Sequence, residues 1–395
     1  MLRRSHFDLI PILLTTVLAL SALYAPQPLL PLLQQQFGVT REAAAALTTI
    51  TFIPLALAPL VYGYLLETVA PIRILKIAVP LLALSSLLFA AADSYGLLLA
   101  LRLVQGLLIP ALLTSLMTYL SARSTTETLQ HTMAIYIAAT IFGGFAGRAT
   151  SGLIAHLLGW RFSFVFLAVS LLIACALLYR LQPPVVESKF VRPQPRALLD
   201  VLRKPNFLPL YCGVFCLFLV FSAVMNFLPF RLTELSDQAD SLRIGLMYSG
   251  YMMGIVTSLG ARWFIARAGD EITTIRYGLL LLLTITVAGL ALPYVSLLFT
   301  AMFLFCGSMF LIHSTASGLV NRLGGSQYRG LTNGLYVAFY YAGGSIGSFA
   351  PGIIYQQAGW GVFLVSLGLV CVVGYFSFSR VRPAAGQVAG EDAGA

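Results

Sequence analysis

One stretch of this sequence occurs twice, 200 residues apart, so any fold of the chain must accommodate two copies of it. The first copy spans residues 136–160 and the second spans residues 336–360, and they align without a gap. A fixed shift of half the chain length indicates an internal duplication. The coinciding residues are mostly glycines: Tyr136, Ala138, Gly143, Gly144, Gly147, Gly152, Gly159 and Trp160 match Tyr336, Ala338, Gly343, Gly344, Gly347, Gly352, Gly359 and Trp360.

Each copy lies in an apolar segment and contains two glycines spaced four residues apart, Gly143 and Gly147 in the first and Gly343 and Gly347 in the second. Small residues at this spacing let another helix backbone approach closely, which is the usual packing mode inside a bilayer. The pattern therefore predicts close helix contacts. These glycines serve packing alone, or they also let the helices rock or slide as a gate.

The whole chain has the same apolar character. Of its 395 residues, 59% are hydrophobic and 10% are charged, whereas an ordinary soluble domain has about 25% charged residues. So few charges cannot cover a soluble protein, and the composition predicts an integral membrane protein. The net charge of +10 would suit nucleic acid, but the basic residues lie in short loops between apolar runs. We interpret them as topology signals and expect no nucleic-acid binding.

Twelve apolar segments are near the length of about 20 residues that crosses a membrane. The first is too long for a cleavable signal peptide, and it has a counterpart, because Ser21, Ala22 and Pro28 recur as Ser222, Ala223 and Pro229. The sequence predicts an all-α membrane protein with twelve transmembrane helices in two pseudo-symmetric six-helix bundles. The helices are expected at residues 9–34, 42–66, 72–92, 95–121, 129–157, 162–181, 207–233, 242–267, 273–292, 294–321, 330–357 and 361–380.

A basic hydrophilic stretch separates the duplicated halves. We place an N-terminal six-helix bundle at residues 1–182, a cytoplasmic linker at 183–206, a C-terminal six-helix bundle at 207–382 and a disordered cytoplasmic tail at 383–395. With the N-terminus inside, 18 Lys and Arg residues lie on the cytoplasmic side and four on the opposite face. This imbalance predicts that both termini are cytoplasmic.

No arrangement of residues indicates an enzyme. The sequence lacks a Walker loop, a nucleophile–base spacing and a cluster of metal ligands. We therefore expect no catalytic residue, no metal and no cofactor, and no transport driven by ATP from this chain.

The predicted helices resemble the major facilitator superfamily over nearly the whole chain, and local patterns refine this resemblance. The run Arg102-Leu-Val-Gln-Gly106 matches the R-x-x-Q-G motif of the family. The run Gly143-Gly-Phe-Ala-Gly147 resembles its antiporter motif, and Gly159-Trp-Arg161 follows it. The stretch Tyr24-Ala-Pro-Gln-Pro-Leu-Leu-Pro31, together with His313-Ser314, is similar to the YnfM-like, arabinose-efflux-permease-type branch of inner-membrane exporters.

The sequence departs from the family pattern in its loop signatures and in the antiporter motif, and the counterpart of the loop signature in the second half keeps only Arg267-Ala-Gly269-Asp270. The loop signature G-x-L-A-D-R-x-G-R-K reads here as Gly63-Tyr-Leu-Leu-Glu67-Thr-Val-Ala-Pro-Ile-Arg73, so Glu67 stands for the Asp and Arg73 supplies the cation, while the second Gly is lost. In the antiporter motif, Gly144 stands where the family has Pro, and Arg148 stands where it has Gly.

Ionisable residues inside membrane helices are functional candidates by default. Arg102 lies about 10 Å from the outer end of its helix, and Arg148 is at a similar depth. Arg102 either clamps carbonyls of the first helix or couples proton and substrate movement; Arg148 either reaches the outer interface or lines the cavity. No Asp or Glu lies in the middle of a helix. His313 is placed to take a proton near neutral pH, or it is a hydrogen-bonded packing residue.

The candidate coupling and gating residues are Arg102, Gln105, Gly106, Arg148, His313, Glu67, Arg73, Gly143, Gly147, Gly343 and Gly347. The resemblance also implies a central cavity lined by helices 1, 4, 7 and 10 and by parts of their neighbours. The residues that are candidates for lining this cavity carry aromatic rings and neutral polar groups, which suit a neutral or anionic organic substrate. They are Tyr24, Gln27, Thr114, Tyr136, Asn226, Tyr336 and Tyr340. Pro26 and Pro28 in helix 1, and Pro229 in helix 7, are expected to break these helices near the outer gate.

The resemblance implies a secondary active transporter. We expect proton-coupled export of a small organic molecule, such as a drug, sugar or metabolite, across the bacterial inner membrane by a monomeric, multi-pass antiporter that works by alternating access. A proton-coupled uptake permease is one alternative. The other is a membrane receptor or scaffold that has the same fold and does not transport.

Overall fold

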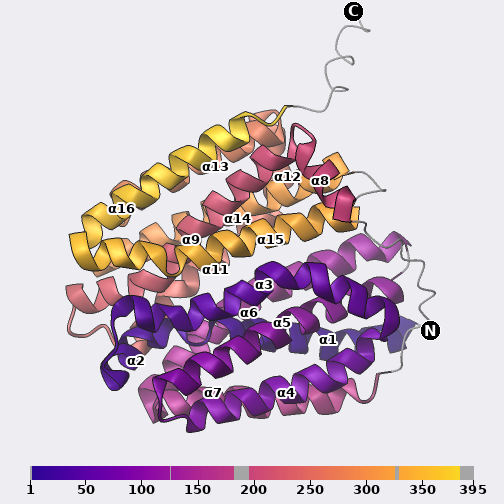
Figure 1. The fold of residues 1–395 in the computed structure, drawn as a ribbon, viewed down its shortest axis with the longest axis horizontal. Helices are drawn as coiled ribbons and strands as arrows, with labels where there is room; N and C mark the ends of the chain where they lie inside the picture. The colour runs from indigo at the N-terminus through magenta and orange to yellow at the C-terminus, as the bar shows by residue number, and fades with distance from the viewer. Residues whose placement is uncertain (1, 125, 182–194, 325–328, 383–395) are drawn as a thin grey trace, which may run out of the picture.

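The computed structural model describes residues 2–124, 126–181, 195–324 and 329–382, and the regular structure within these ranges is helical (Figure 1). The first part of the chain contains α1 (Leu2–Tyr24), η1 (Gln27–Leu29), α2 (Leu30–Phe37), α3 (Arg41–Thr68), α4 (Pro71–Ala91), α5 (Tyr95–Arg123), α6 (Thr126–Leu158) and α7 (Trp160–Leu178). The second part contains α8 (Pro195–Arg203), α9 (Phe207–Leu235), α10 (Ser241–Met247), η2 (Tyr248–Gly250), α11 (Tyr251–Leu259), α12 (Ala261–Ala268), α13 (Glu271–Thr284), η3 (Ile285–Gly289), α14 (Val295–Gly324), α15 (Arg329–Gly347) and α16 (Ala350–Ser379).

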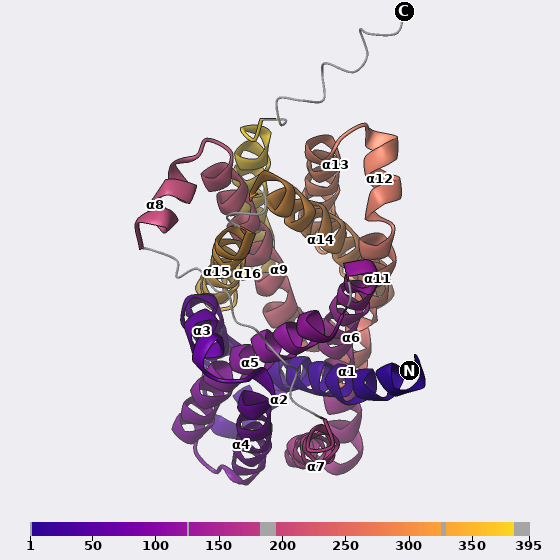
Figure 2. The same ribbon diagram turned by 90° about the vertical axis from the view of Figure 1, so that its right-hand side faces the viewer.

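The helices form two groups, one above the other in Figure 1. The first group is α1 to α7, in which α3 packs on α5, α4 on α7 and α1 on α6. The second group is α8 to α16, in which α9 packs on α15 and α16, and α11 packs on α14. The groups meet where α3 contacts α15 and where α6 contacts α10 and α11. Figure 2 shows α3 beside α15 and α6 beside α11.

The apolar helices have the lengths that the sequence predicts for membrane spans. Among the described residues, nine helices or helix runs are long and apolar enough to cross a membrane, and the bent pair Ser241–Leu259 and Ala261–Ala268 adds a tenth. The run Leu331–Ser379 contains two of the predicted segments, and α3 corresponds to a further one. The predicted all-α membrane fold is confirmed.

The two ends of the molecule differ. The start of α1, at the right in Figure 1, and the end of α16, at the top and right of centre, mark one end of the molecule, which we call the terminal end. The short helix α2 lies at the opposite end, which we call the distal end. Of the predicted linker and tail, residues 182–194 and 383–395 lie outside the described ranges, and the described part of the linker contains a helix, α8, that the sequence analysis did not predict.

Helix breaks occur at some of the expected positions and not at others. The first span breaks as predicted, because α1 ends at Tyr24 and a 3-10 turn at 27–29 precedes α2. The prediction for Pro229 was wrong: α9 continues through it from Phe207 to Leu235. A proline leaves the carbonyl four residues earlier without its helical donor. Here that carbonyl, of Met225, accepts a hydrogen bond of 2.7 Å from the Tyr248 hydroxyl, so the helix need not break.

A break that was not predicted interrupts the segment expected at 330–357. Helix α15 ends at Gly347 and α16 begins at Ala350, with Pro351 in its first turn. The Gly352 N–H bonds to the Phe349 carbonyl at 3.0 Å, which leaves the Ser348 carbonyl free for another donor. The chain then kinks again at Gly359, where φ is +82°.

Candidate functional site

Arg102 is a fully buried side chain of α5 that joins α5 to α1 and α3. Its Nε donates to the Leu47 carbonyl at 2.9 Å, its Nη1 to the Ala22 carbonyl at 2.9 Å, and its Nη2 to the Leu23 carbonyl at 2.6 Å. Gln105 Oε1 and Thr51 Oγ1 accept further bonds, at 2.7 and 3.2 Å. All three nitrogens therefore have partners, in the arrangement of the predicted carbonyl clamp.

Arg148 is also fully buried, and it does not extend to an interface. Its Nε donates to Gln27 Oε1 at 2.6 Å, and its Nη1 donates to the Gly144 carbonyl at 2.6 Å. Its Nη2 is buried without a hydrogen-bond partner among the described residues. Three tyrosine rings surround the guanidinium, with centroids 4.0 Å away for Tyr24, 4.6 Å for Tyr251 and 4.9 Å for Tyr248. We call Arg148 and these three rings the arginine cage.

The two residues that depart from the antiporter motif, Gly144 and Arg148, are neighbours in this cage. A Cβ atom on Gly144 would lie 3.3 Å from Arg148 Nη1, 3.4 Å from a ring carbon of Tyr251 and 3.5 Å from one of Tyr24. A side chain at 144 would therefore press on the guanidinium, while its Cβ atom would be in ordinary van der Waals contact with the two rings. Glycine at 144 makes room for arginine at 148.

A chain of polar contacts runs from the cage into the second group. Gln27, which accepts from Arg148, donates through Nε2 to Asn226 Oδ1 at 2.6 Å. Asn226 donates in turn to the Ser348 carbonyl at 3.1 Å, the carbonyl that the break between α15 and α16 leaves free. The Ser348 hydroxyl lies 2.7 Å from that of Thr49 in α3. Arg148, Gln27 and Asn226 are fully buried, so this chain crosses the interior of the protein between the groups.

A cluster of rings lies next to the cage. The Tyr24 ring is 6.1 Å from the Phe52 ring, which is 5.6 Å from Phe218. The Phe218 ring stacks on Tyr340 at 3.7 Å, and Tyr340 is 4.8 Å from His313. Two sequence candidates, Tyr340 and Tyr24, are therefore connected through ring contacts.

His313 and Tyr336 form a second polar contact of the second group. Nδ1 of His313 lies 2.8 Å from the Tyr336 hydroxyl, which also lies 3.2 Å from the His313 carbonyl. The duplicated position in the first group, Tyr136, donates to the Leu113 carbonyl at 3.0 Å. The histidine is thus an addition of the second half to an arrangement that both halves share.

The repeated glycines lie where helix backbones cross. A Cβ atom on Gly143 would be 2.7 Å from the Val17 carbonyl oxygen, and one on Gly147 would be 2.4 Å from the Ser21 Cα. In the second group, the corresponding distances are 2.1 Å from Gly343 to the Phe215 oxygen and 2.1 Å from Gly347 to the Leu219 oxygen. The predicted close helix contacts are present in both halves, α6 against α1 and α15 against α9.

The remaining sequence candidates are dispersed. Gly106 lets α5 approach α3, since its Cβ atom would be 2.8 Å from the Thr51 Cα. The Thr114 hydroxyl donates to the Pro110 carbonyl of its own helix at 2.6 Å. Arg73 is exposed in the first turn of α4, and the side chain of Glu67 lies outside the described part of the structure.

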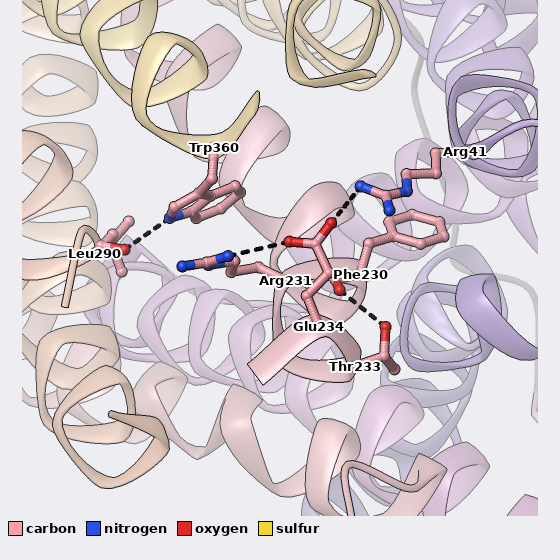
Figure 3. A network of polar contacts seen from close by, with 7 residues as sticks. All are labelled: Arg41, Phe230, Arg231, Thr233, Glu234, Leu290 and Trp360. Atoms are coloured by element: carbon pink, nitrogen blue, oxygen red, sulfur yellow. Dashed lines mark hydrogen bonds and ion pairs between the residues drawn. The ribbon is translucent and has the colours of Figure 1, made fainter. Parts of the chain in front are cut away.

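The distal end carries a network of charges that joins the two groups, shown in Figure 3. Glu234 at the end of α9 accepts from Arg41 of α3 at 2.6 Å and from Arg231 at 3.1 Å. The Arg41 guanidinium also lies over the Tyr355 ring, 4.9 Å from its centroid. A depression of about 690 Å³ opens beside these side chains. A further contact between the groups, His156 to Asp240, measures 3.1 Å.

Several of these partners were missed by the sequence analysis. Tyr248 and Tyr251 complete the cage, and their spacing of three residues on one helical segment was the available signal. Arg41 and Arg231 were interpreted only as topology signals, although they flank Glu234. By contrast, Tyr24, Gln27, Arg148 and Asn226 were all candidates, and the structure brings them into one cluster.

These features define a class of protein before any comparison: a multi-pass helical membrane protein whose two halves touch through buried polar side chains. A model of the Major Facilitator Superfamily matches residues 12–348, and the chain belongs to this superfamily.

Relatives of the chain are transporters. It is 26% identical over 372 residues to the inner membrane transport protein YnfM of Escherichia coli (strain K12), covering 91% of this chain and 87% of the relative. It is 28% identical over 354 residues to the uncharacterized MFS-type transporter YybF of Bacillus subtilis (strain 168), covering 86% and 84%. The protein is therefore a secondary transporter for small molecules in a membrane, and its relatives are not enzymes.

Solved structures share the fold. A mutant of the nucleoside transporter NupG superposes with a TM-score of 0.79 at 14% identity, covering 95% of this chain and all of the other, 100%. A bacterial homolog of the human lysosomal transporter Spinster, in an inward-facing and occupied conformation, gives 0.76 at 14% identity and covers 96% and 97%. At this identity the likeness shows the fold alone.

Proposed function

We propose that the protein exports a small organic molecule from the cytoplasm in exchange for protons, by alternating access between its two groups of helices. The observation that carries the proposal is the buried chain from Arg148 through Gln27 and Asn226 to Ser348. It holds the groups together at the distal end through side-chain hydrogen bonds, which can break and re-form without unfolding a helix. The excess of Lys and Arg supports placing both termini in the cytoplasm and the distal end outside.

The contact between His313 and Tyr336 supports proton coupling. A neutral imidazole has one nitrogen that accepts and one that donates, whereas a protonated ring has only donors. Proton uptake at His313 therefore changes how Nδ1 can bond to the Tyr336 hydroxyl, and this change acts on the contact between α14 and α15. The export direction is supported by the resemblance of Gly143–Gly147 to the antiporter motif.

Substrate-dependent proton flux tests the proposal. Everted and right-side-out vesicles containing the protein receive an imposed proton gradient, and a pH-sensitive dye reports the flux as aromatic acids, sugars, nucleosides and lipophilic drugs are added in turn. Export predicts substrate uptake and dissipation of the gradient in everted vesicles. We expect His313→Gln to abolish the proton flux, since a glutamine side-chain amide does not take up a proton at the pH values of the assay.

The other outcomes distinguish the two alternatives. Gradient-driven uptake in right-side-out vesicles alone would make the protein an uptake permease. No flux with any compound in either orientation would favour a receptor or scaffold with the same fold.

A further inference from the structure

Two buried arginines in the first group have very different surroundings. Arg102 has an oxygen partner on each nitrogen, and these partners all belong to α1, α3 and α5 of its own group. Arg148 uses only Nε and Nη1, and its buried Nη2 has no partner among the described residues. Two of its three tyrosine rings come from the second group. Arg148 is therefore the arginine with a free donor and a position between the halves.

The charge of Arg148 lacks a formal counter-charge. Within the described ranges, none of its contacts is a carboxylate: its partners are an amide oxygen, a backbone carbonyl and ring faces. A buried cation without a paired anion is costly, and ring faces and neutral oxygens offset only part of this cost. An anion at the free donor would offset more of it.

We propose that Arg148 binds the carboxylate of a small aromatic acid, and that this acid is the class of molecule that the protein carries. This inference rests on the proposed function, because it assigns the substrate of the same transport cycle. The guanidinium is enclosed here, so the carboxylate binds in a state in which Tyr248 and Tyr251 have withdrawn with the second group. The cage and the ligand are then alternative partners of one arginine.

The arrangement of donors selects a carboxylate. Gln27 occupies Nε and the Gly144 carbonyl takes one bond from Nη1, so the donors that remain are on Nη2 and on the second position of Nη1. These form the planar fork that binds the two oxygens of a carboxylate. A neutral acceptor can take one of these bonds but brings no counter-charge to Arg148, and a cation is repelled by it.

The adjoining rings select an aromatic body. Tyr24 contacts Phe52, and Phe52 contacts both Phe218 and Tyr341, with centroids 5.6 and 5.8 Å away. Phe52 and Phe218 belong to different groups, so their contact also changes when the groups separate. Aromatic rings prefer offset or edge-to-face neighbours at such distances, and a ligand ring can replace one partner in the cluster.

Equilibrium binding of carbon-14 benzoate to the full-length protein in nanodiscs tests the inference. We expect saturable binding with a Kd below about 1 mM. Benzamide and benzylammonium should not compete, because they lack the carboxylate, and acetate should compete at least about tenfold more weakly, because it lacks the ring. Absence of benzoate binding, or equal competition by benzamide, overturns the inference.

Variants assign the binding to the cage. Arg148→Gln should abolish benzoate binding, and Arg148→Lys should weaken it by about tenfold or more, because lysine retains the charge and loses the fork. Arg276→Gln is the matched control, since Arg276 also donates to a side-chain oxygen, Ser379 at 3.0 Å, and lies over a ring, Tyr375, but lies outside the cage. Unchanged binding in Arg148→Gln overturns the inference. If that variant does not fold, the Lys variant decides in the same way.

A reversible disulfide across the distal end tests whether the tyrosine rings and the carboxylate are alternative partners of Arg148. In Thr49→Cys/Ser348→Cys, the two hydroxyl positions that lie 2.7 Å apart become a disulfide that holds the distal end closed. The oxidised protein should lose benzoate binding and the reduced protein should regain it. Binding that is insensitive to oxidation overturns the exchange of partners.

The binding assay does not require transport, so the two proposals can fail separately. Proton flux with other compounds, without benzoate binding, would overturn only the assignment of the substrate. Benzoate binding that depends on Arg148, without flux in vesicles, would overturn the proposed function and leave an anion-binding site.

Discussion

Two prolines leave backbone carbonyls without their helical donor, and buried polar side chains from other helices donate to these carbonyls instead. Pro26 cannot donate to the Ala22 carbonyl, four residues earlier, and Arg102 donates to that oxygen instead. Pro229 leaves the Met225 carbonyl in the same position, and Tyr248 donates to it. The ring of the same Tyr248 lies against the Arg148 guanidinium, which is 4.9 Å from the ring centroid. The first pairing could be anticipated from the sequence, because Arg102 belongs to a recognisable motif, whereas nothing local connects Tyr248 to Pro229.

Removing the Tyr248 hydroxyl should destabilise the protein. In Tyr248→Phe the Met225 carbonyl stays buried without a donor, and an unsatisfied buried group costs about 1–3 kcal/mol. We expect a lower melting temperature in nanodiscs. Tyr277→Phe is the control, because Tyr277 is 63% exposed. Equal melting temperatures for the two variants would contradict this account of how α9 continues through Pro229.

Lysine should not replace Arg102. The arginine reaches carbonyls of α1 and α3 with three nitrogens, and a single ammonium group cannot hold both helices in this geometry. We expect Arg102→Lys to reduce substrate-dependent proton flux nearly as much as Arg102→Ala, about tenfold or more, because removing one partner leaves buried carbonyls unpaired. Flux and melting temperature are measured together. Full flux in the lysine variant would mean that Arg102 acts as a point charge.

At the scale of helices, the sequence predicted most spans and only some of their breaks. Glycine spacing indicated the crossings of α6 with α1 and of α15 with α9, because a backbone contact depends on small residues that are visible locally. The break before Pro351 and the continuity through Pro229 were not predictable in the same way. Each depends on a partner far along the chain. Asn226 donates to the Ser348 carbonyl that the break in the helix leaves free, and Tyr248 donates to the Met225 carbonyl that Pro229 leaves free, so that α9 continues.

Large side chains at the crossings should block movement of the helices. A leucine at Gly147 or Gly347 would meet backbone atoms within 2.4 or 2.1 Å of its Cβ position, and overpacking of this kind costs about 1–3 kcal/mol. We expect Gly147→Leu and Gly347→Leu to insert into the membrane and to lose proton flux. Gly361→Leu is the control, since nothing lies within 4 Å of its Cβ position. Normal flux in both crossing variants would exclude a gating role.

At the scale of the whole molecule, the contacts between the two groups lie toward the distal end. Polar contacts between described side chains that join the groups there include Gln27–Asn226, Arg41–Glu234, Thr49–Ser348 and His156–Asp240. Their partners are separated by 84 to 299 residues, with 240 − 156 = 84 for the shortest separation. Sequence patterns identify helices and short motifs, and pairs so far apart become neighbours only when the two groups assemble. This is why the duplication was predictable and the closure of the distal end was not.

Glu234 should stabilise the state in which the distal end is closed. Its carboxylate lies between Arg41 and Arg231, and Glu234→Gln would leave these two cations facing each other without an anion. The side chains of Arg41 and Glu234 are 31% and 30% exposed, so solvent screens the pair, and such pairs contribute at most about 1 kcal/mol each. We therefore expect Glu234→Gln to shift the equilibrium toward a distal-open state by about two- to tenfold.

Spin labels on Gln35→Cys and Gln357→Cys, two exposed positions in different groups, report this shift as a longer component in the distance distribution. Glu271→Gln is the matched control, because Glu271 pairs with Arg322 inside the second group and that pair does not join the groups. The control should leave the distribution unchanged. A distribution for Glu234→Gln equal to that of the control would show that the ion pairs contribute nothing to closure, and that the buried chain from Arg148 to Ser348 holds the distal end without them.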